Sequence, residues 1–236
     1  MVTAADWGRI HRAFLDGDVF WKQFPEVVTR AALHTLIFTA GGFVIGLSLA
    51  LVLALMRLSP LRPYRWFAAT WIEVFRGIPA LITIFAVGFA MPIALGVRVP
   101  GIYGPGCAAL GIVYSAYMAE TIRAGIEAVP RGQVEAARSL GMTPVRSTVS
   151  IVLPQAFRII VPPMTNELVS LIKDTSLLAL LGTTAETIEI TKFSKDAVNK
   201  TFNITPLVAG ALVYLAITIP ATRAISLLER RNRRAR

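Results

Sequence analysis

Long uncharged stretches alternate with short charged segments along most of this sequence. No charged residue occurs between Arg30 and Arg57, a run of about 26 positions, and roughly 20 apolar residues are enough to cross the hydrocarbon core of a membrane. Further apolar stretches cover residues 78–97, a run that ends at Ala119, residues 159–182 and residues 201–222. The pattern therefore predicts an all-α integral membrane protein with five transmembrane helices.

The first apolar stretch carries small residues at a spacing that lets two helices approach closely, at Gly41, Gly42, Gly46 and Ser48. A short basic loop with Arg57, Arg62 and Arg65 follows it.

A helix is predicted to break where the second stretch begins. Pro79 lacks a backbone donor and restricts the conformation of Ile78, and Gly77 precedes them. Glu73 and Arg76 are three residues apart, so they are predicted to pair on one helix face.

The segments outside the spans define the proposed domain boundaries. Residues 1–30 interleave aromatic and charged side chains, which is typical of an amphipathic helix at the membrane surface; a flexible polar terminus is the alternative. These residues contain no apolar core of the length found in a signal peptide. The transmembrane domain is predicted over residues 31–228 and a basic cytoplasmic tail over residues 229–236.

A polar island interrupts the apolar pattern between residues 131 and 154. Residues 134–140 favour a short helix, and Gly141 stands where a helix commonly ends in a left-handed residue. Thr143 and Pro144 suit the N-cap and first position of a second helix. We therefore predict two helices that meet at a sharp bend outside the membrane.

The spacing within this island resembles the cytoplasmic coupling motif of permease subunits of bacterial ABC importers. The motif consists of Glu-Ala-Ala, a glycine four residues later, and Ile-x-Leu-Pro after a further nine. Its positions are matched by Glu135, Ala136, Ala137, Gly141, Ile151, Leu153 and Pro154. The resemblance implies that a coupling loop over residues 124–158 docks a separate ATPase subunit.

Three further segments resemble the polar amino acid branch of this family: residues 73–79, with Ile78 in place of the usual threonine, residues 117–126 and residues 171–177. The resemblance implies the type I importer permease fold. It also implies partners: a second permease subunit, identical or related, a dimer of ATPase subunits that binds ATP and magnesium, and an extracellular or periplasmic solute-binding protein. The implied substrate is a polar amino acid of the glutamate, glutamine, aspartate, arginine or histidine type.

Composition and charge agree with a membrane location. The chain of 236 residues is 55% hydrophobic and 16% charged, with a net charge of +10, and its mean hydropathy is +0.62. In a membrane protein, a basic excess reflects cytoplasmic loops rather than nucleic-acid binding. Cys107 is the only cysteine, so neither an internal disulfide nor a cysteine metal cluster is expected.

Basic residues also predict the orientation. With the coupling loop and the C-terminus inside, 14 arginines face the cytoplasm and 8 lysines or arginines face outside, leaving out Arg76 and Lys173 as membrane-embedded. This count predicts that the N-terminus lies outside, and the resemblance implies a multi-pass protein of the bacterial plasma membrane.

Charged and polar residues inside the fourth stretch are candidates for a substrate path. A charge at this depth is costly, by about 2.5–3.5 kcal/mol, so it faces protein or water. Asp174 is the preferred group for a substrate ammonium, with Asn166 as its neutral partner and Lys173 turned toward Glu120 or Glu73. The candidate set is Asp174, Asn166, Glu167, Lys173, Thr175, Glu120 and Arg76.

Structural ion pairs are the alternative for these residues. One such pair would lie within the fourth stretch, and another would join Glu120 to Arg123 at the membrane edge.

No motif predicts an enzyme. The chain lacks Gly-x-x-x-x-Gly-Lys-Ser/Thr, His-Glu-x-x-His and Gly-x-Ser-x-Gly, so ATP hydrolysis is expected on a partner and no cofactor or metal in this chain. An ion-coupled secondary transporter and a structural membrane protein are the alternative functions. A secondary transporter has no use for a docking motif with this spacing, and a structural protein would show no substrate-dependent stimulation of ATP hydrolysis in the assembled complex.

Overall fold

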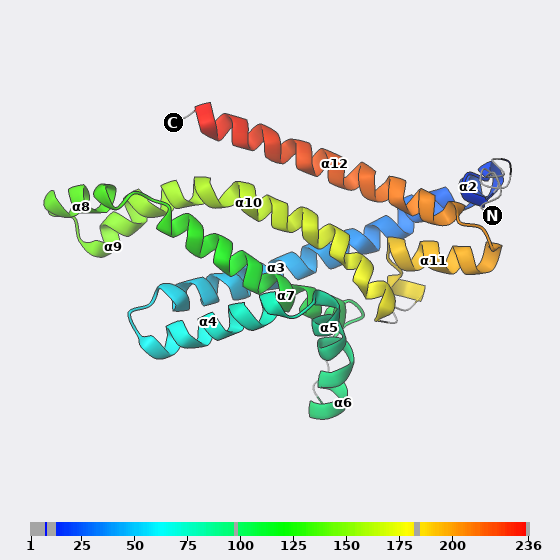
Figure 1. Ribbon diagram of the computed structural model, residues 1–236, viewed down its shortest axis with the longest axis horizontal. Coiled ribbons are helices and arrows are strands. Elements are labelled where there is room, and N and C mark those ends of the chain that lie inside the picture. The colour runs from blue at the N-terminus through cyan, green and yellow to red at the C-terminus, as the bar shows by residue number, and fades with distance from the viewer. Residues whose placement is uncertain (1–7, 9–12, 97–98, 182–184, 235–236) are drawn as a thin grey trace, which may run out of the picture.

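Long helices lying side by side build this molecule (Figure 1). A computed structural model describes residues 8, 13–96, 99–181 and 185–234, and these residues contain helices and no strand. The elements are α2 (Gly17–Glu26), η1 (Val27–Ala31), α3 (Ala32–Leu58), α4 (Arg62–Gly77), α5 (Ala80–Phe85), η2 (Ala86–Ala90), α6 (Met91–Leu95), α7 (Gly104–Glu127), α8 (Arg131–Ser139), α9 (Pro144–Ser147), η3 (Thr148–Val152), α10 (Leu153–Asp174), η4 (Thr175–Leu180), η5 (Ala185–Thr187), α11 (Ile190–Thr201) and α12 (Thr205–Arg234).

Two described helices are long and apolar enough to cross a membrane, namely Gly17–Leu58, with 42 residues, and Thr205–Ala224, with 20. Helix α4 and the helical segment that follows it form a third candidate, which bends by 108° at the break. The predicted break at Ile78 and Pro79 is therefore confirmed. The predicted stretch over residues 78–97 turns away from α4 instead of continuing it.

Helices α7 and α10 have 24 and 22 residues, which is enough length for a span. They do not reach the apolar composition of the other candidates. For α7 the packing supplies the reason, because neighbouring helices bury much of its length and protein rather than lipid surrounds it. Few residues of α10 are buried. The composition of these two helices thus leaves the predicted count of five spans without confirmation.

Close contact between α3 and α7 forms the centre of the main core. A Cβ atom added to Gly111 of α7 would lie 2.5 Å from Cγ2 of Ile45 and 3.2 Å from the backbone nitrogen of Gly46, both on α3. A Cβ on Gly42 would lie 3.0 Å from Cβ of Leu110. The predicted role of the small residues in the first stretch is confirmed at Gly42 and Gly46.

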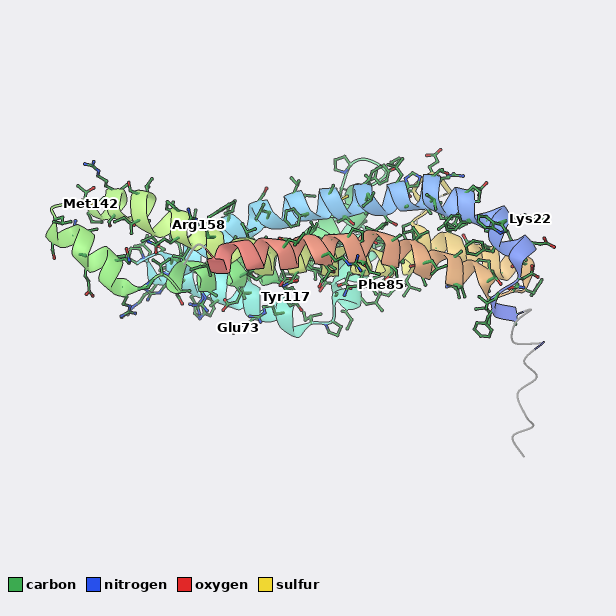
Figure 2. All side chains as sticks on the ribbon, turned by 90° about the horizontal axis from the view of Figure 1, so that it is seen from above. Lys22, Glu73, Phe85, Tyr117, Met142 and Arg158 are labelled. Atoms are coloured by element: carbon green, nitrogen blue, oxygen red, sulfur yellow. The ribbon has the colours of Figure 1, made fainter. Side chains whose placement is uncertain are left out.

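A second, smaller core joins α11 and α12 to the start of the long first helix. It contains Val27, Ala31, Ile190, Phe193 and Val213. Figure 2 shows that this end, marked by Lys22, lies opposite the end marked by Met142.

Glu189 is fully buried at the edge of this second core. Its carboxylate caps α11, accepting hydrogen bonds of 2.6 Å from the backbone N–H groups of Thr191 and Lys192. The hydroxyl of Tyr214 on α12 donates to the same carboxylate at 3.2 Å. Burial raises the pKa of Glu189 from 4.5 to about 7, and the donated hydrogen bonds offset only part of that effect.

We predict that Gly111→Ala destabilises the fold, since the new methyl group would overlap Ile45 and approach the backbone of α3. Overpacking of this kind costs about 1–3 kcal/mol. The matched control is Gly17→Ala, because a Cβ at Gly17 meets nothing within 4 Å. Thermal unfolding of the detergent-solubilised chain should show a lower midpoint for Gly111→Ala only. Equal midpoints for the two variants would show that the contact between α3 and α7 has room for a methyl group.

We also predict that Glu189 makes stability depend on pH. The folded state binds the proton more tightly than the unfolded chain, so the contribution is complete below about pH 4.5 and is lost as pH rises through about 7. A pKa raised to about 7 corresponds to about 3 kcal/mol in total. Unfolding midpoints at pH 5 and pH 8 should differ less in Glu189→Gln than in the unchanged chain. An identical pH response in both proteins would contradict this assignment.

Candidate functional site

The polar island forms a two-helix projection at one end of the molecule. Helix α8 ends in hydrogen bonds from the N–H of Met142 to the carbonyl of Ala137, at 3.1 Å, and from the N–H of Gly141 to the carbonyl of Arg138, at 3.0 Å. Gly141 adopts a φ of 82°, which only glycine adopts cheaply. This pair of bonds is the Schellman arrangement, so the predicted end of the first helix is confirmed.

The second helix of the projection starts where the sequence indicated. The hydroxyl of Thr143 accepts a 3.2 Å hydrogen bond from the N–H of Arg146, and α9 begins at Pro144. Helix α9, η3 and α10 then run on without an interruption to Asp174. Met142 lies at the tip, farther from the bundle than Arg158 (Figure 2).

The seven motif residues divide between surface and interior. Ala137 is buried at 3% exposure and Ile151 is partly buried. The exposed positions are Glu135, Ala136, Gly141, Leu153 and Pro154. Small side chains on this surface let another backbone approach closely.

The structure adds apolar residues that the sequence analysis missed. Leu140 is 86% exposed and Val145 is 73% exposed, and both lie at the bend. Large apolar side chains exposed together on a polar projection mark an interaction surface. The signal was present in the sequence, since Leu140 directly precedes Gly141 and Val145 directly follows Pro144, where the bend was predicted.

A second group of polar residues lies along α7, where it faces α10 and α4, and Arg76 of this group is exposed. The hydroxyl of Tyr114 on α7 donates a 3.0 Å hydrogen bond to the carboxylate of Asp174 on α10. The guanidinium of Arg76 lies 5.7 Å from the centre of the Tyr117 ring, which is within the range of a cation–π interaction. Three elements therefore contribute to one polar cluster, and Tyr114 was not among the predicted residues.

Residues on α10 fall on two stripes. Glu167 and Asp174 are seven residues apart and partly buried, whereas Asn166 and Lys173, also seven apart, are exposed. Asp174 thus shares its stripe with Glu167, and the predicted partnership with Asn166 is not formed. Thr175 is buried and its hydroxyl donates to the carbonyl of Ile172 at 2.7 Å, so it closes the helix end.

Several predicted ion pairs are replaced by others. Arg123 pairs with Glu120 and Glu127, which is the membrane-edge alternative for Glu120. Within the described residues, Lys173 forms no ion pair with Glu120 or Glu73, and Arg76 forms none with Glu73. Arg76 is directed toward the Tyr117 ring because α7 supplies an aromatic face there, which a local i,i+3 pattern does not reveal.

No group of three or more histidine, cysteine or acidic side chains is arranged to hold a metal ion within the part of the chain that the structure describes.

Comparison with known proteins gives a family match across most of the chain. Residues 20–234 match the family described as binding-protein-dependent transport system inner membrane component. A probable glutamine ABC transporter permease of Bacillus subtilis is 37% identical over 211 residues, covering 89% of this chain and 94% of that protein. An arginine transport system permease of the same organism is 32% identical over 218 residues, covering 92% and 97%.

Solved structures show the same architecture. The structure of an amino acid ABC transporter with histidines matches with a TM-score of 0.78 and 30% identity, covering 97% of this chain and 99% of the other. A methionine ABC transporter in an inward-facing conformation matches with a TM-score of 0.66 at 18% identity, which supports the fold alone.

Proposed function

Since the chain belongs to the binding-protein-dependent transport system inner membrane components, among the amino acid ABC permeases, we propose that it forms half of an ATP-driven importer pore. In this proposal a solute-binding protein delivers a polar amino acid outside the cell. A separate ATPase dimer drives translocation through the projection formed by α8 and α9. The single observation that carries the proposal is this projection, which presents Leu140 at 86% exposure beside the spaced motif.

The five spans of the proposed pore are the helix ending at Leu58, the bent pair formed by α4 and residues 80–94, α7, α10 and α12. Residues 78–97, predicted as the second span by themselves, contribute here only as the second part of that bent pair. The turn between α3 and α4 lies toward the same end as α8 and α9 (Figure 1). Successive long helices then alternate in direction, and the N-terminus faces outside. This arrangement is consistent with the excess of arginine at the end that carries the projection.

Helical continuity supports the coupling step. Residues 144–174 are helical throughout, from the first residue of α9 to Asp174. At 1.5 Å per residue such a rod is roughly 46 Å long. Displacement of the projection by the ATPases would therefore move Asp174 as part of the same body, which is how alternating access would reach the substrate path.

The polar cluster supports an amino acid as substrate. An amino acid carries both an ammonium and a carboxylate, so its path needs groups of each sign. Asp174 and Glu167 offer negative charge on one stripe of α10, and Arg76 offers positive charge from α4. We assign the ammonium to Asp174 and the carboxylate to Arg76.

We predict that Leu140→Asp lowers retention of the ATPase dimer during purification by at least about tenfold, since truncating an anchor of an interface commonly costs 2 kcal/mol or more. Phe202→Asp is the matched control, because Phe202 is 94% exposed and lies outside the projection. Both variants add one negative charge. Undiminished retention with Leu140→Asp would reject the docking surface, and so would an equal loss with Phe202→Asp.

For the substrate path, we expect Asp174→Asn to reduce amino acid uptake by reconstituted vesicles by roughly 10- to 100-fold, because a charge-assisted hydrogen bond contributes about 1.5–3 kcal/mol. Basal ATP hydrolysis should persist. Tyr114→Phe removes the hydrogen bond to Asp174 but keeps its charge, and should reduce uptake much less.

Equal losses in these two variants would assign Asp174 a structural role. Uptake that continues without ATP while an ion gradient is held would replace the importer with a secondary transporter.

A further inference from the structure

An open cavity of about 520 Å³ lies at the turn between α3 and α4, and none of its lining residues belongs to the projection or to the polar cluster. It is lined by Arg57, Arg62, Pro63, Arg65, Trp66 and Ala69. Three of the six residues carry a positive charge and none carries a negative charge.

The three arginines lack acidic partners in the described part of the chain. No ion pair of 4.0 Å or less joins any of them to a described carboxylate, and Glu120 is paired with Arg123 instead. Arg65 donates to the carbonyls of Ser59 and Pro60, at 3.5 and 3.4 Å, so it also holds the turn. Three positive charges without an ion-pair partner among the described residues, around one cavity, favour the binding of an anion.

Apolar side chains next to the cavity place it at a membrane edge. On α3, Val52 and Leu55 are 55% and 68% exposed, and Leu55 lies two residues before Arg57. On α4, Trp66 is 75% exposed and Phe67 is 52% exposed. Tryptophan is enriched at the level of the lipid headgroups. The cavity therefore lies where an apolar, lipid-facing surface gives way to a basic one.

We propose that this cavity binds the phosphate of an anionic phospholipid, with phosphatidylglycerol as the probe. Guanidinium groups bind phosphate with paired hydrogen bonds, which a lysine cannot provide. The ring of Trp66 covers the glycerol and upper acyl region. A lipid is favoured over an acidic protein surface because the flanking residues are exposed apolar side chains on spanning helices, whereas the projection with the coupling motif is built from α8 and α9.

The test measures lipid retention by the purified full-length chain, using native mass spectrometry with phosphatidylglycerol and phosphatidylcholine of identical acyl chains. The test variant is Arg57→Gln with Arg62→Gln, which leaves the hydrogen bonds of Arg65 intact. The control is Lys195→Gln with Lys200→Gln, two exposed cations on α11. Inorganic phosphate at millimolar concentration is added in a separate arm.

We expect the unchanged chain to prefer phosphatidylglycerol, and the arginine variant to lose roughly thirty-fold of that preference, since each basic side chain near an anionic surface contributes about fivefold. The lysine control should retain it. Arg57→Lys with Arg62→Lys keeps the charge, so this variant should lose a smaller part of the preference for phosphatidylglycerol. It also shows whether a folding defect explains the result with the glutamine variant.

Three outcomes overturn the proposal. The first is an unchanged preference in the arginine variant. The second is an equal loss in the lysine control. The third is displacement of the lipid by inorganic phosphate, which would indicate a site for free anions.

If the arginine variant keeps the lipid but loses the ATPase dimer, the cavity is a protein contact and the lipid site is rejected. Lipid retention is measured without transport, so its failure leaves the proposed importer function untouched.

Discussion

The arrangement of this molecule depends on the contact between the backbones of α3 and α7. Gly46 and Gly111 meet where no room exists for a side chain. This contact fixes the rotation of α7, which then directs Tyr114 toward α10 and Tyr117 toward α4. The polar cluster therefore forms beside a packing constraint on the same helix, since a Cβ added to Gly46 would lie 3.5 Å from Cβ of Tyr114.

Sequence reasoning succeeded where local chemistry decides the structure. Gly141 requires a left-handed backbone, and Pro79 cannot continue a helix, so both breaks were predictable from single residues. The helices on each side of Gly141 followed from capping rules. The spaced motif then identified the family, because its residues all belong to the projection and the start of α10 and their spacing does not depend on the rest of the fold.

Sequence reasoning failed where partners come from different helices. Arg76 has Glu73 at a suitable local spacing, yet it lies over Tyr117, because α7 packs against that face of α4. Glu189 reads as a loop residue, but tertiary packing buries it completely against α12. Neither outcome depends on a neighbour in sequence, so no local pattern carries it. A related reason keeps α7 outside the apolar span candidates: a helix surrounded by protein need not be apolar.

The composition of α7 also bears on how the protein is made. The long helix that ends at Leu58 is apolar enough to enter a membrane by itself as it leaves the ribosome, whereas α7 is not among the helices with that property. Helix α7 gains a suitable environment only after α3 has been inserted into the bilayer and while the glycine face of α3 is still uncovered. We therefore expect α3 to be inserted into the membrane first, and α7 to be inserted later by packing against α3.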